Sequence, residues 1–379
     1  MGELKLKMRK VQVEITSECN LDCEYCLRKN LKGSFIQPEL IEGLDFKEYI
    51  LYGYGEPFLH PKLKEIVSKI DGRITISTNG MVDGSFKEIV DLVDKIGISV
   101  DFDGKIRKGL KFNKIVDKIR TLDGKGIMQV VVTRDNLHNI HKLAEISASN
   151  GMDFLATNVV APNEVIYRKA LYFEGSKRNV EMAKGLNEEF LIDAIVGLSK
   201  GDVKNYRNLL NKAYGEGYSL NLLAIMNLQD KIDIAYRAEK IFEEIADITK
   251  SYGVELIKPE FFGDAKNREC PYKNGMFVRV DGSVSPCMSF AYSHNEFVNN
   301  HQKYIKSYLP ANLNQELDDV FEALDEFERL RQNMENFPWC ADCPYVRGCW
   351  YSEKNIDCYR NDPSCSECLY SSKIARCLL

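Results

Sequence analysis

Along the first part of the chain, short segments with the apolar–polar alternation of a β-strand take turns with longer segments that have the periodicity of an α-helix. Strand-like alternation or short apolar runs occupy 11–16, the start of 48–57, 73–78, 97–101, 127–134 and 154–160. Helical periodicity lies between them, at 61–70, 86–95, 112–122 and 138–150. Repeated strand–helix units predict an α/β fold with a parallel sheet and helices outside it.

The remainder of the chain has a different pattern. Residues 162–250 are mostly helical in pattern, and 277–287 predict a β-hairpin that turns at Asp281-Gly282. An acidic amphipathic helix follows and ends before Pro338. We therefore expect three parts: a core of strand–helix units at 1–165, a helical segment that completes or bridges it at 166–260, and a cysteine-rich domain at 261–379.

Three cysteines, Cys19, Cys23 and Cys26, follow the first predicted strand on a polar loop. The carboxyl end of a strand is where an α/β barrel carries its chemistry. Thiolates are soft ligands that suit iron–sulfur clusters and zinc. Three thiolates leave one iron of a four-iron cluster open, whereas a structural zinc site normally needs a fourth Cys or His. Buried inert cysteines are the alternative, but a polar loop is poor core material.

Composition limits the partners and the compartment. The 51 basic and 56 acidic residues leave a net charge of −5, which argues against a large footprint for nucleic acid. No run of about 18 apolar residues is present to span a bilayer, and the first residues lack the apolar core of a signal peptide. We expect a cytoplasmic protein without membrane or nucleic-acid partners. Its twelve cysteines are then poor candidates for disulfides, because the cytosol keeps thiols reduced.

The spacing Cys-x3-Cys-x2-Cys, with Tyr25 directly before Cys26, resembles the signature of the radical S-adenosylmethionine (SAM) enzymes. The resemblance implies a 4Fe-4S cluster held by the three thiolates, whose free iron binds SAM. It further implies reductive cleavage of SAM to a 5'-deoxyadenosyl radical that abstracts hydrogen from a substrate. Tyr25 would be a neighbour of the adenine, and the strand–helix units would form a partial (β/α)6 TIM-like barrel.

The segment from Gly53 to Pro57, Gly-Tyr-Gly-Glu-Pro, resembles the Gly-Gly-Glu-Pro motif of the same family. By itself it predicts only a tight turn, since glycine allows close backbone approach and proline stops a strand. The resemblance implies that Gly53, Gly55 and Glu56 hold the methionine amino group of SAM. Tyr54 stands where the family often has its first glycine.

Polar residues at the ends of the later predicted strands are candidates to line the mouth of the barrel. These residues are Ser77, Thr78, Asn79, Ser99, Asp101, Thr133, Arg134, Asn136 and Asn158. Each of them can instead cap a helix or satisfy a turn. Members of the family commonly bring a hydroxyl to the SAM ribose and a basic group to its carboxylate, so we place Ser77, Ser99 and Arg134 first as SAM contacts.

Nine further cysteines lie in the C-terminal part of the chain: Cys270, Cys287, Cys340, Cys343, Cys349, Cys358, Cys365, Cys368 and Cys377. Two Cys-x2-Cys pairs have nearly the spacing of a zinc site, which would use only four of them. Two four-iron clusters would use eight. A hairpin Gly-x4-Cys followed by Cys-x2-Cys-x5-Cys resembles the SPASM extension of radical SAM maturases, which implies two auxiliary 4Fe-4S clusters.

The resemblance also implies how these ligands divide. The first auxiliary cluster would take Cys270, Cys287 and Cys358, although Cys358 follows Cys349 at a longer interval than in the family. The second would take the three thiols of the Cys-x2-Cys-x5-Cys segment and one of Cys365, Cys368 and Cys377. The tail, which ends Asp-Cys-x6-Cys-x2-Cys, also looks like that of maturases linked to tungsten-dependent aldehyde oxidoreductases.

Together these features predict a radical SAM maturase of the oxidoreductase type. Its substrate would be a peptide, a protein side chain or a cofactor precursor, and a ferredoxin or flavodoxin would supply electrons. The alternative is a non-catalytic iron–sulfur electron-transfer or scaffold protein. The Gly-Tyr-Gly-Glu-Pro turn discriminates between the two, since an electron carrier needs no SAM site.

Overall fold

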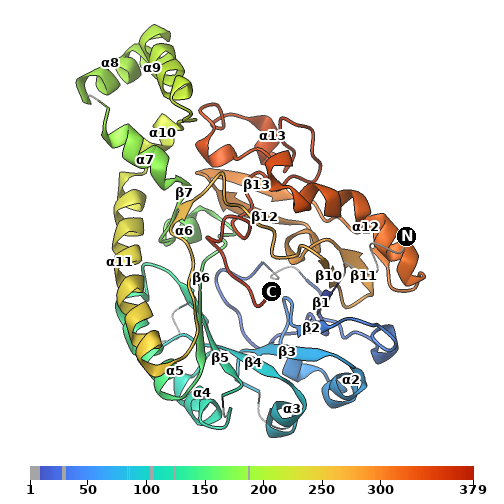
Figure 1. Ribbon diagram of the computed structural model, residues 1–379. Helices are drawn as coiled ribbons and strands as arrows, with labels where there is room; N and C mark the ends of the chain where they lie inside the picture. Colours follow the sequence, from blue (N-terminus) through green and yellow to red (C-terminus); the bar gives the residue numbers. More distant parts are fainter. Residues whose placement is uncertain are drawn as a thin grey trace.

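The computed structural model of the protein describes residues 9–27, 31–82, 84, 86–102, 106–122, 124–186 and 188–379. A ten-stranded sheet forms its centre (Figure 1). The strands lie in the order β14 (Ala311–Asn312), β11 (Ser283–Ser285), β10 (Gly275–Val278), β1 (Lys10–Val13), β2 (Glu48–Leu51), β3 (Arg73–Thr78), β4 (Lys95–Ser99), β5 (Gly126–Val132), β6 (Asp153–Asn158) and β8 (Leu256–Ile257). Because β1 to β6 are consecutive, parallel neighbours, the predicted α/β fold with a partial barrel is confirmed.

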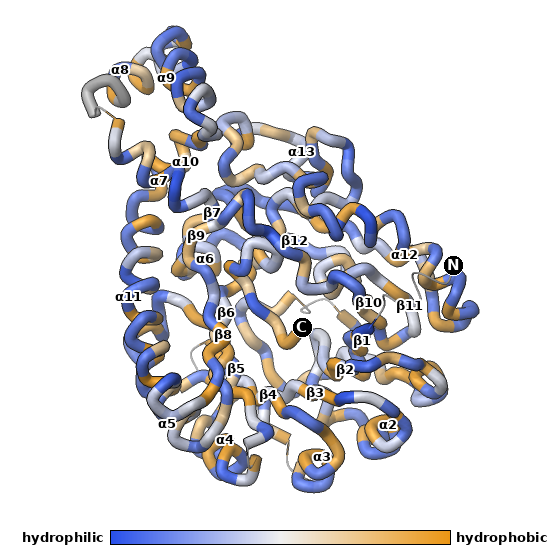
Figure 2. Tube along the Cα trace, viewed as in Figure 1, coloured by the Kyte–Doolittle hydropathy of each residue, from blue (hydrophilic) through white to orange (hydrophobic). Residues whose placement is uncertain are grey.

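Four helices connect these strands and cover the outer face of the sheet (Figure 1). They are α2 (Leu63–Lys69), α3 (Phe86–Leu92), α4 (Phe112–Ile119) and α5 (Ile140–Ser149). Val13, Leu51, Ile76 and Ile98 from successive strands are fully buried. Figure 2, coloured by hydropathy, shows hydrophobic segments along the central strands. Burial of β-branched and leucine side chains between sheet and helices stabilises the barrel and fixes where its strands end.

The boundary between α3 and β4 differs from the predicted one. The helix was expected to reach Lys95, but it ends at Leu92, and β4 already begins at Lys95. The carboxylate of Asp94 accepts a hydrogen bond from the amide of Ile74, and the amide of Asp94 donates to the carbonyl of Ile74. This exchange with β3 draws the chain into the sheet earlier than the hydrophobic periodicity indicates.

The helical segment begins after α6 (Glu164–Tyr167) and β7 (Phe173–Ser176), which pairs with β9 (Phe262–Gly263). Its helices are α7 (Lys177–Lys184), α8 (Glu188–Ser199), α9 (Lys204–Gly215), α10 (Leu222–Asn227) and α11 (Gln229–Tyr252). Helices α8 and α9 stand out from the body at the top of Figure 1. Helix α11 packs against α5 and leads to β8 at one edge of the sheet.

The C-terminal part joins the barrel through its first hairpin. Strand β10 pairs in parallel with β1 and antiparallel with β11, so the predicted hairpin extends the barrel sheet. A second hairpin, β12 (His294–Val298) and β13 (His301–Ile305), stands apart from this sheet. Helices α12 (Leu317–Gln332) and α13 (Trp350–Glu353) follow. The sheet includes strands from all three expected parts, and the division at 165 and 260 stays a prediction.

The chain ends beside the mouth of the barrel, where Figure 1 marks the C-terminus. Arg376 and Cys377 line the same pocket as residues from β5 and β6. Within the ranges described above, none of the helices combines the length and apolar character that crossing a membrane requires.

Candidate active site and cysteine groups

A pocket of about 260 Å³ lies at the carboxyl ends of β1 to β6. Cys19, Cys23 and Cys26 line this pocket, as expected from their position directly after the first strand. From the following strands it is lined by Gly53, Tyr54, Gly55, Glu56, Ser77, Thr78, Asn79, Ser99 and Asn158. The sheet therefore gathers residues far apart in sequence around one opening, as parallel strands do at their carboxyl ends.

Gly55 brings the glycine-rich turn against the cysteine loop. A Cβ atom at this position would lie 2.1 Å from the carbonyl oxygen of Thr16 and 2.6 Å from that of Glu18. The adjacent amide of Glu56 donates a hydrogen bond to the same Glu18 carbonyl at 2.7 Å. Only glycine permits this approach of two backbones, so the turn holds the loop that carries the thiols.

The carboxylate of Glu56 is buried and accepts three hydrogen bonds. Its donors are the amide of Phe58 at 3.1 Å, the hydroxyl of Thr78 at 2.7 Å and the amide of Asn79 at 2.6 Å. Burial raises the pKa of Glu56, while these hydrogen bonds and Lys118 act in the opposite direction. Glu56 thus joins the turn after β2 to the end of β3.

Asn79 connects that strand end to the cysteine loop. Its side-chain amide donates to the side-chain carbonyl of Asn20 at 2.7 Å and lies 3.8 Å from the sulfur of Cys19. The Tyr25 hydroxyl is buried without a hydrogen-bond partner among the described residues. Arg107 also lines the pocket, and its guanidinium lies 5.5 Å from the centre of the Tyr25 ring.

The three predicted SAM contacts at strand ends have different surroundings. Ser77 and Ser99 both line the pocket, and the Ser77 hydroxyl donates to the side-chain carbonyl of Gln129 at 2.6 Å. Arg134 does not line it. Its guanidinium instead binds the carboxylate of Asp230, at the start of α11, at 3.1 Å. The chain turns away after β5 to form the loop before α5, and this carries Arg134 to a different surface.

Four C-terminal cysteines surround a second, smaller cavity of about 50 Å³: Cys270, Cys287, Cys365 and Cys368. Burial raises the pKa of the Cys270 thiol to about 11, with Arg331 opposing and Cys368 adding to the effect. Burial also raises the pKa of Cys287, and Cys270 and Cys368 again add to it. We call these four residues the inner cysteine group.

Four of the other five cysteines of this part lie close together in the sequence, and we call them the outer cysteine group: Cys340, Cys343, Cys349 and Cys358. Burial raises the pKa of Cys343, and the nearby Cys358 and Cys349 raise it further. Burial, Glu367 and Cys343 together raise the pKa of Cys340 to about 12. Cys358, which was expected with Cys270 and Cys287, does not line the cavity of the inner group, and its role as a ligand of the first auxiliary cluster stays a prediction. Helix α13 lies between Cys349 and Cys358.

Cys377 belongs to neither group, because it lines the pocket that holds the three N-terminal thiols. No disulfide joins any of the twelve cysteines, all of which lie in described ranges. Among the described residues, no three Cys, His, Asp or Glu side chains are gathered closely enough to hold a single metal ion. Three soft donors in a pocket that also contains the unpartnered hydroxyl of Tyr25 fit an iron–sulfur cluster beside a small-molecule site.

Comparison with known proteins finds a matching C-terminal domain and a similar overall fold. A family model described as the SPASM iron–sulfur cluster-binding domain matches residues 270–344. The crystal structure of Streptococcus suis SuiB bound to S-adenosylmethionine has a similar fold, with a TM-score of 0.50 at 14% identity over 91% of this chain and 74% of that one. These similarities support the expected resemblance to radical SAM proteins with a C-terminal SPASM-type domain.

Two further similarities extend along most of the chain. The tungsten-containing aldehyde ferredoxin oxidoreductase cofactor-modifying protein of Pyrococcus furiosus is 24% identical over 98% of this chain and 97% of its own length. The structure of native anSMEcpe with bound AdoMet and Cp18Cys peptide has a TM-score of 0.51 at 16% identity, over 96% of this chain and 94% of that one. The name of the Pyrococcus furiosus protein refers to tungsten-dependent aldehyde oxidoreductases, and the cysteine-rich tail of this chain resembles maturases linked to the same enzymes.

Sequence reasoning missed several residues of the pocket. Arg107 lies well beyond Ser99, the last residue of β4, so the rule that strand ends line the mouth does not include it. Gln129 is a polar residue within an apolar strand, which is also a readable signal. Tyr370 and Arg376 also line the pocket, but nothing in their local pattern indicates that the C-terminal tail returns to the barrel.

Proposed function

We propose that this protein is a radical SAM maturase that holds a 4Fe-4S cluster through Cys19, Cys23 and Cys26 and binds SAM in the adjoining pocket. The observation that carries the proposal is that the three thiols, the glycine-rich turn and the polar strand ends line one cavity. The cluster and SAM, when bound, supply the one-electron chemistry that activates an unreactive C–H bond.

The residues of the chain position these groups. Gly55 fixes the turn on the cysteine loop, and Glu56 orders the end of β3 through its three hydrogen bonds. The hydroxyls of Ser77 and Ser99 and the ring of Tyr25 are available to the ribose and adenine, while Gly53 contributes backbone to the methionine end.

In this proposal Arg107, rather than Arg134, is the basic residue that contacts the SAM carboxylate. Arg107 lines the pocket beside Tyr25, whereas Arg134 pairs with Asp230 elsewhere. A guanidinium presents several donors in a fixed plane, which matches a carboxylate.

We assign one auxiliary 4Fe-4S cluster to the inner cysteine group and one to the outer group. Each group has the four thiols that such a cluster uses. Cys377 then has no role as an auxiliary ligand. Its place in the SAM pocket instead puts a thiol close to where the substrate must lie.

Two of the similarities support a proposal for the substrate class. The Pyrococcus furiosus protein, similar over nearly the whole chain, is named for modifying a cofactor, and anSMEcpe was crystallised with a peptide. We propose a cofactor precursor or peptide associated with a tungsten-dependent oxidoreductase, and a ferredoxin or flavodoxin as the reductant. Comparing turnover with both reductants checks the second assignment.

Electron paramagnetic resonance tests whether SAM binds at the cluster site. Anaerobically reconstituted, reduced protein is expected to show a cluster signal that changes when SAM is added. The variant with Ala at Cys19, Cys23 and Cys26 keeps the auxiliary signals and loses the response to SAM. A wild-type spectrum that SAM leaves unchanged rejects the proposal and favours a non-catalytic iron–sulfur carrier.

A further inference from the structure

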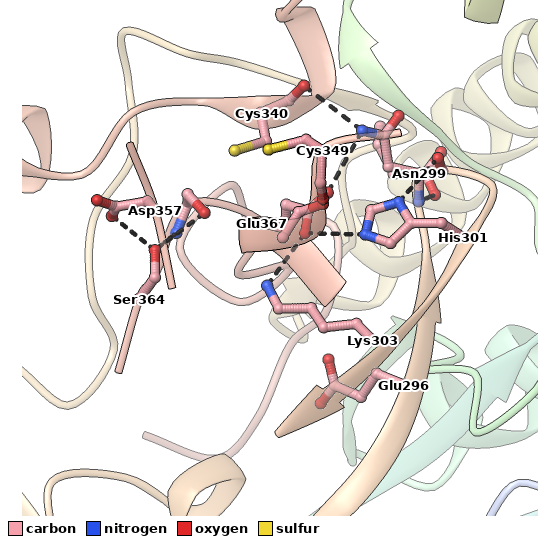
Figure 3. A network of polar contacts seen from close by, with 12 residues as sticks. Glu296, Asn299, His301, Lys303, Cys340, Cys349, Asp357, Ser364 and Glu367 are labelled. Atoms are coloured by element: carbon pink, nitrogen blue, oxygen red, sulfur yellow. Dashed lines mark hydrogen bonds and ion pairs between the residues drawn. The ribbon is translucent and has the colours of Figure 1, made fainter. Parts of the chain in front are cut away.

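A buried ion pair lies in the C-terminal domain outside the barrel pocket. The ammonium of Lys303, on β13, lies 3.1 Å from the carboxylate of Glu367, and the two side chains are 4% and 1% exposed. His301 lies 3.5 Å from the same carboxylate, and the side-chain amide of Asn299 donates to it at 3.3 Å. Figure 3 shows these three side chains converging on Glu367.

The pair is placed between the two cysteine groups. Both of its members line the cavity of the inner group, and Glu367 lies between Cys365 and Cys368 in the sequence. On the other side, the amide of Asn299 reaches the carbonyl of Cys340 at 3.4 Å, and the amide of Cys340 donates to the carbonyl of Ser366 at 3.1 Å. One contiguous network thus joins the pair to both groups.

Arg331 also lines the cavity of the inner group, and it has structural partners of its own. Arg331 pairs with Glu328 and donates to the carbonyl of Pro286 at 2.7 Å and to that of Gly275 at 2.6 Å. Its position is therefore set by the backbone before Cys287. The ammonium of Lys303 donates to no backbone carbonyl among the described residues, and its one hydrogen bond there is to Glu367.

A buried pair of this kind is a weak source of stability, because removing two charges from water costs about as much as their attraction returns. Its effect on a neighbouring redox centre is larger, since charges act strongly where water is excluded. A positive charge stabilises the reduced, more negative form of a cluster and raises its reduction potential. A negative charge lowers it.

We propose that the Lys303–Glu367 pair sets the reduction potentials of the two auxiliary clusters. This rests on the proposed function in that it requires clusters in both cysteine groups. Lys303 raises the potentials, Glu367 lowers them, and the balance between the two decides how readily an electron is accepted at this end of the molecule.

The test is a potentiometric titration of the full, anaerobically reconstituted chain, followed by electron paramagnetic resonance. Lys303→Met lowers at least one auxiliary potential, and Glu367→Gln raises it. The expected size is about tenfold in the equilibrium constant for reduction, or about 59 mV for a one-electron couple. Lys303→Arg keeps the positive charge and therefore leaves the balance between the two charges of the pair unchanged.

The matched controls come from an exposed pair of the same residue types. Lys64→Met and Glu88→Gln change the same charges at a pair whose side chains are 60% and 59% exposed, and both leave the potentials unaltered. Shifts of the same sign in Lys303→Met and Glu367→Gln, or no shift with full iron content, overturn the inference.

Iron analysis separates this inference from the proposed function. Wild-type protein that takes up no iron contradicts the proposed function before any titration. Wild-type protein with full iron, beside Lys303 and Glu367 variants that both lose a cluster, assigns the pair to assembly of the domain and rejects the tuning role.

Discussion

The backbone amide of Asn79 donates a hydrogen bond of 2.6 Å to the carboxylate of Glu56, and the side chain of Asn79 reaches the loop that carries Cys19. The glycine-rich turn, the end of β3 and the thiols are therefore one connected unit. A change at Glu56 is transmitted to the cluster site without any direct contact between the carboxylate and a thiol.

Replacing Glu56 by Ala leaves the buried amides of Phe58 and Asn79 without their acceptor. We expect a loss of roughly 3 kcal/mol in the free energy of unfolding, since each buried unsatisfied donor costs about 1–3 kcal/mol. SAM binding weakens more than cluster content falls. Denaturant unfolding and SAM titration measure the two effects, and the exposed Glu65→Ala on α2 is the control. Unchanged stability and affinity would contradict this role.

The two arginine assignments are separated by a matched pair of variants. Arg107→Gln should weaken SAM binding by roughly ten- to a hundredfold, because a hydrogen bond to a charged group contributes about 1.5–3 kcal/mol. Arg134→Gln removes the same charge outside the pocket and should leave the affinity unchanged. Calorimetric titration with SAM measures both, and a larger effect at Arg134 would restore the assignment made from the sequence.

The cysteine groups predict a specific pattern of iron loss. Wild-type protein should carry about twelve irons, from three four-iron clusters. Ala at Cys365 should remove about four irons from the inner group, and Ala at Cys358 should do the same for the outer group. Ala at Cys377 should leave the iron content unchanged. Metal analysis that finds about four irons and one zinc would instead support a zinc site in the C-terminal part.

The buried Lys231 predicts that the free energy of unfolding depends on pH. Burial lowers its pKa from 10.5 to about 8, Glu174 opposes this shift, and Arg134 adds to it. Between about pH 8 and 10.5 the unfolded chain binds a proton that the folded chain does not, so stability rises with pH in this window. Lys231→Met should flatten that rise, and the exposed Lys240→Met should not. Identical pH profiles for wild type and Lys231→Met would be incompatible with this.

The barrel could be predicted because the sequence patterns that indicate it are local. Each strand carries its own alternation, and the spacing of Cys19, Cys23 and Cys26 is readable without any tertiary contact. The division of the C-terminal cysteines was not predictable in the same way. Cys365 reaches Cys270 only through the packing of the tail, which no local sequence pattern indicates.

Arg134 shows the limit of the strand-end rule. Ser77 and Ser99 line the pocket and their contacts with SAM stay a prediction, whereas the carboxylate of Asp230, on a helix far along the chain, binds Arg134 at another surface. Only long-range contacts decide which polar residue after a strand faces the pocket.

The most direct measurement of the central claim is product analysis after reduced protein is incubated with SAM. Wild-type protein should form 5'-deoxyadenosine, and the variant with Ala at Cys19, Cys23 and Cys26 should form none while retaining its auxiliary clusters. Formation of 5'-deoxyadenosine by that variant, or its absence with wild-type protein that carries the full complement of iron, would contradict the assignment of this site.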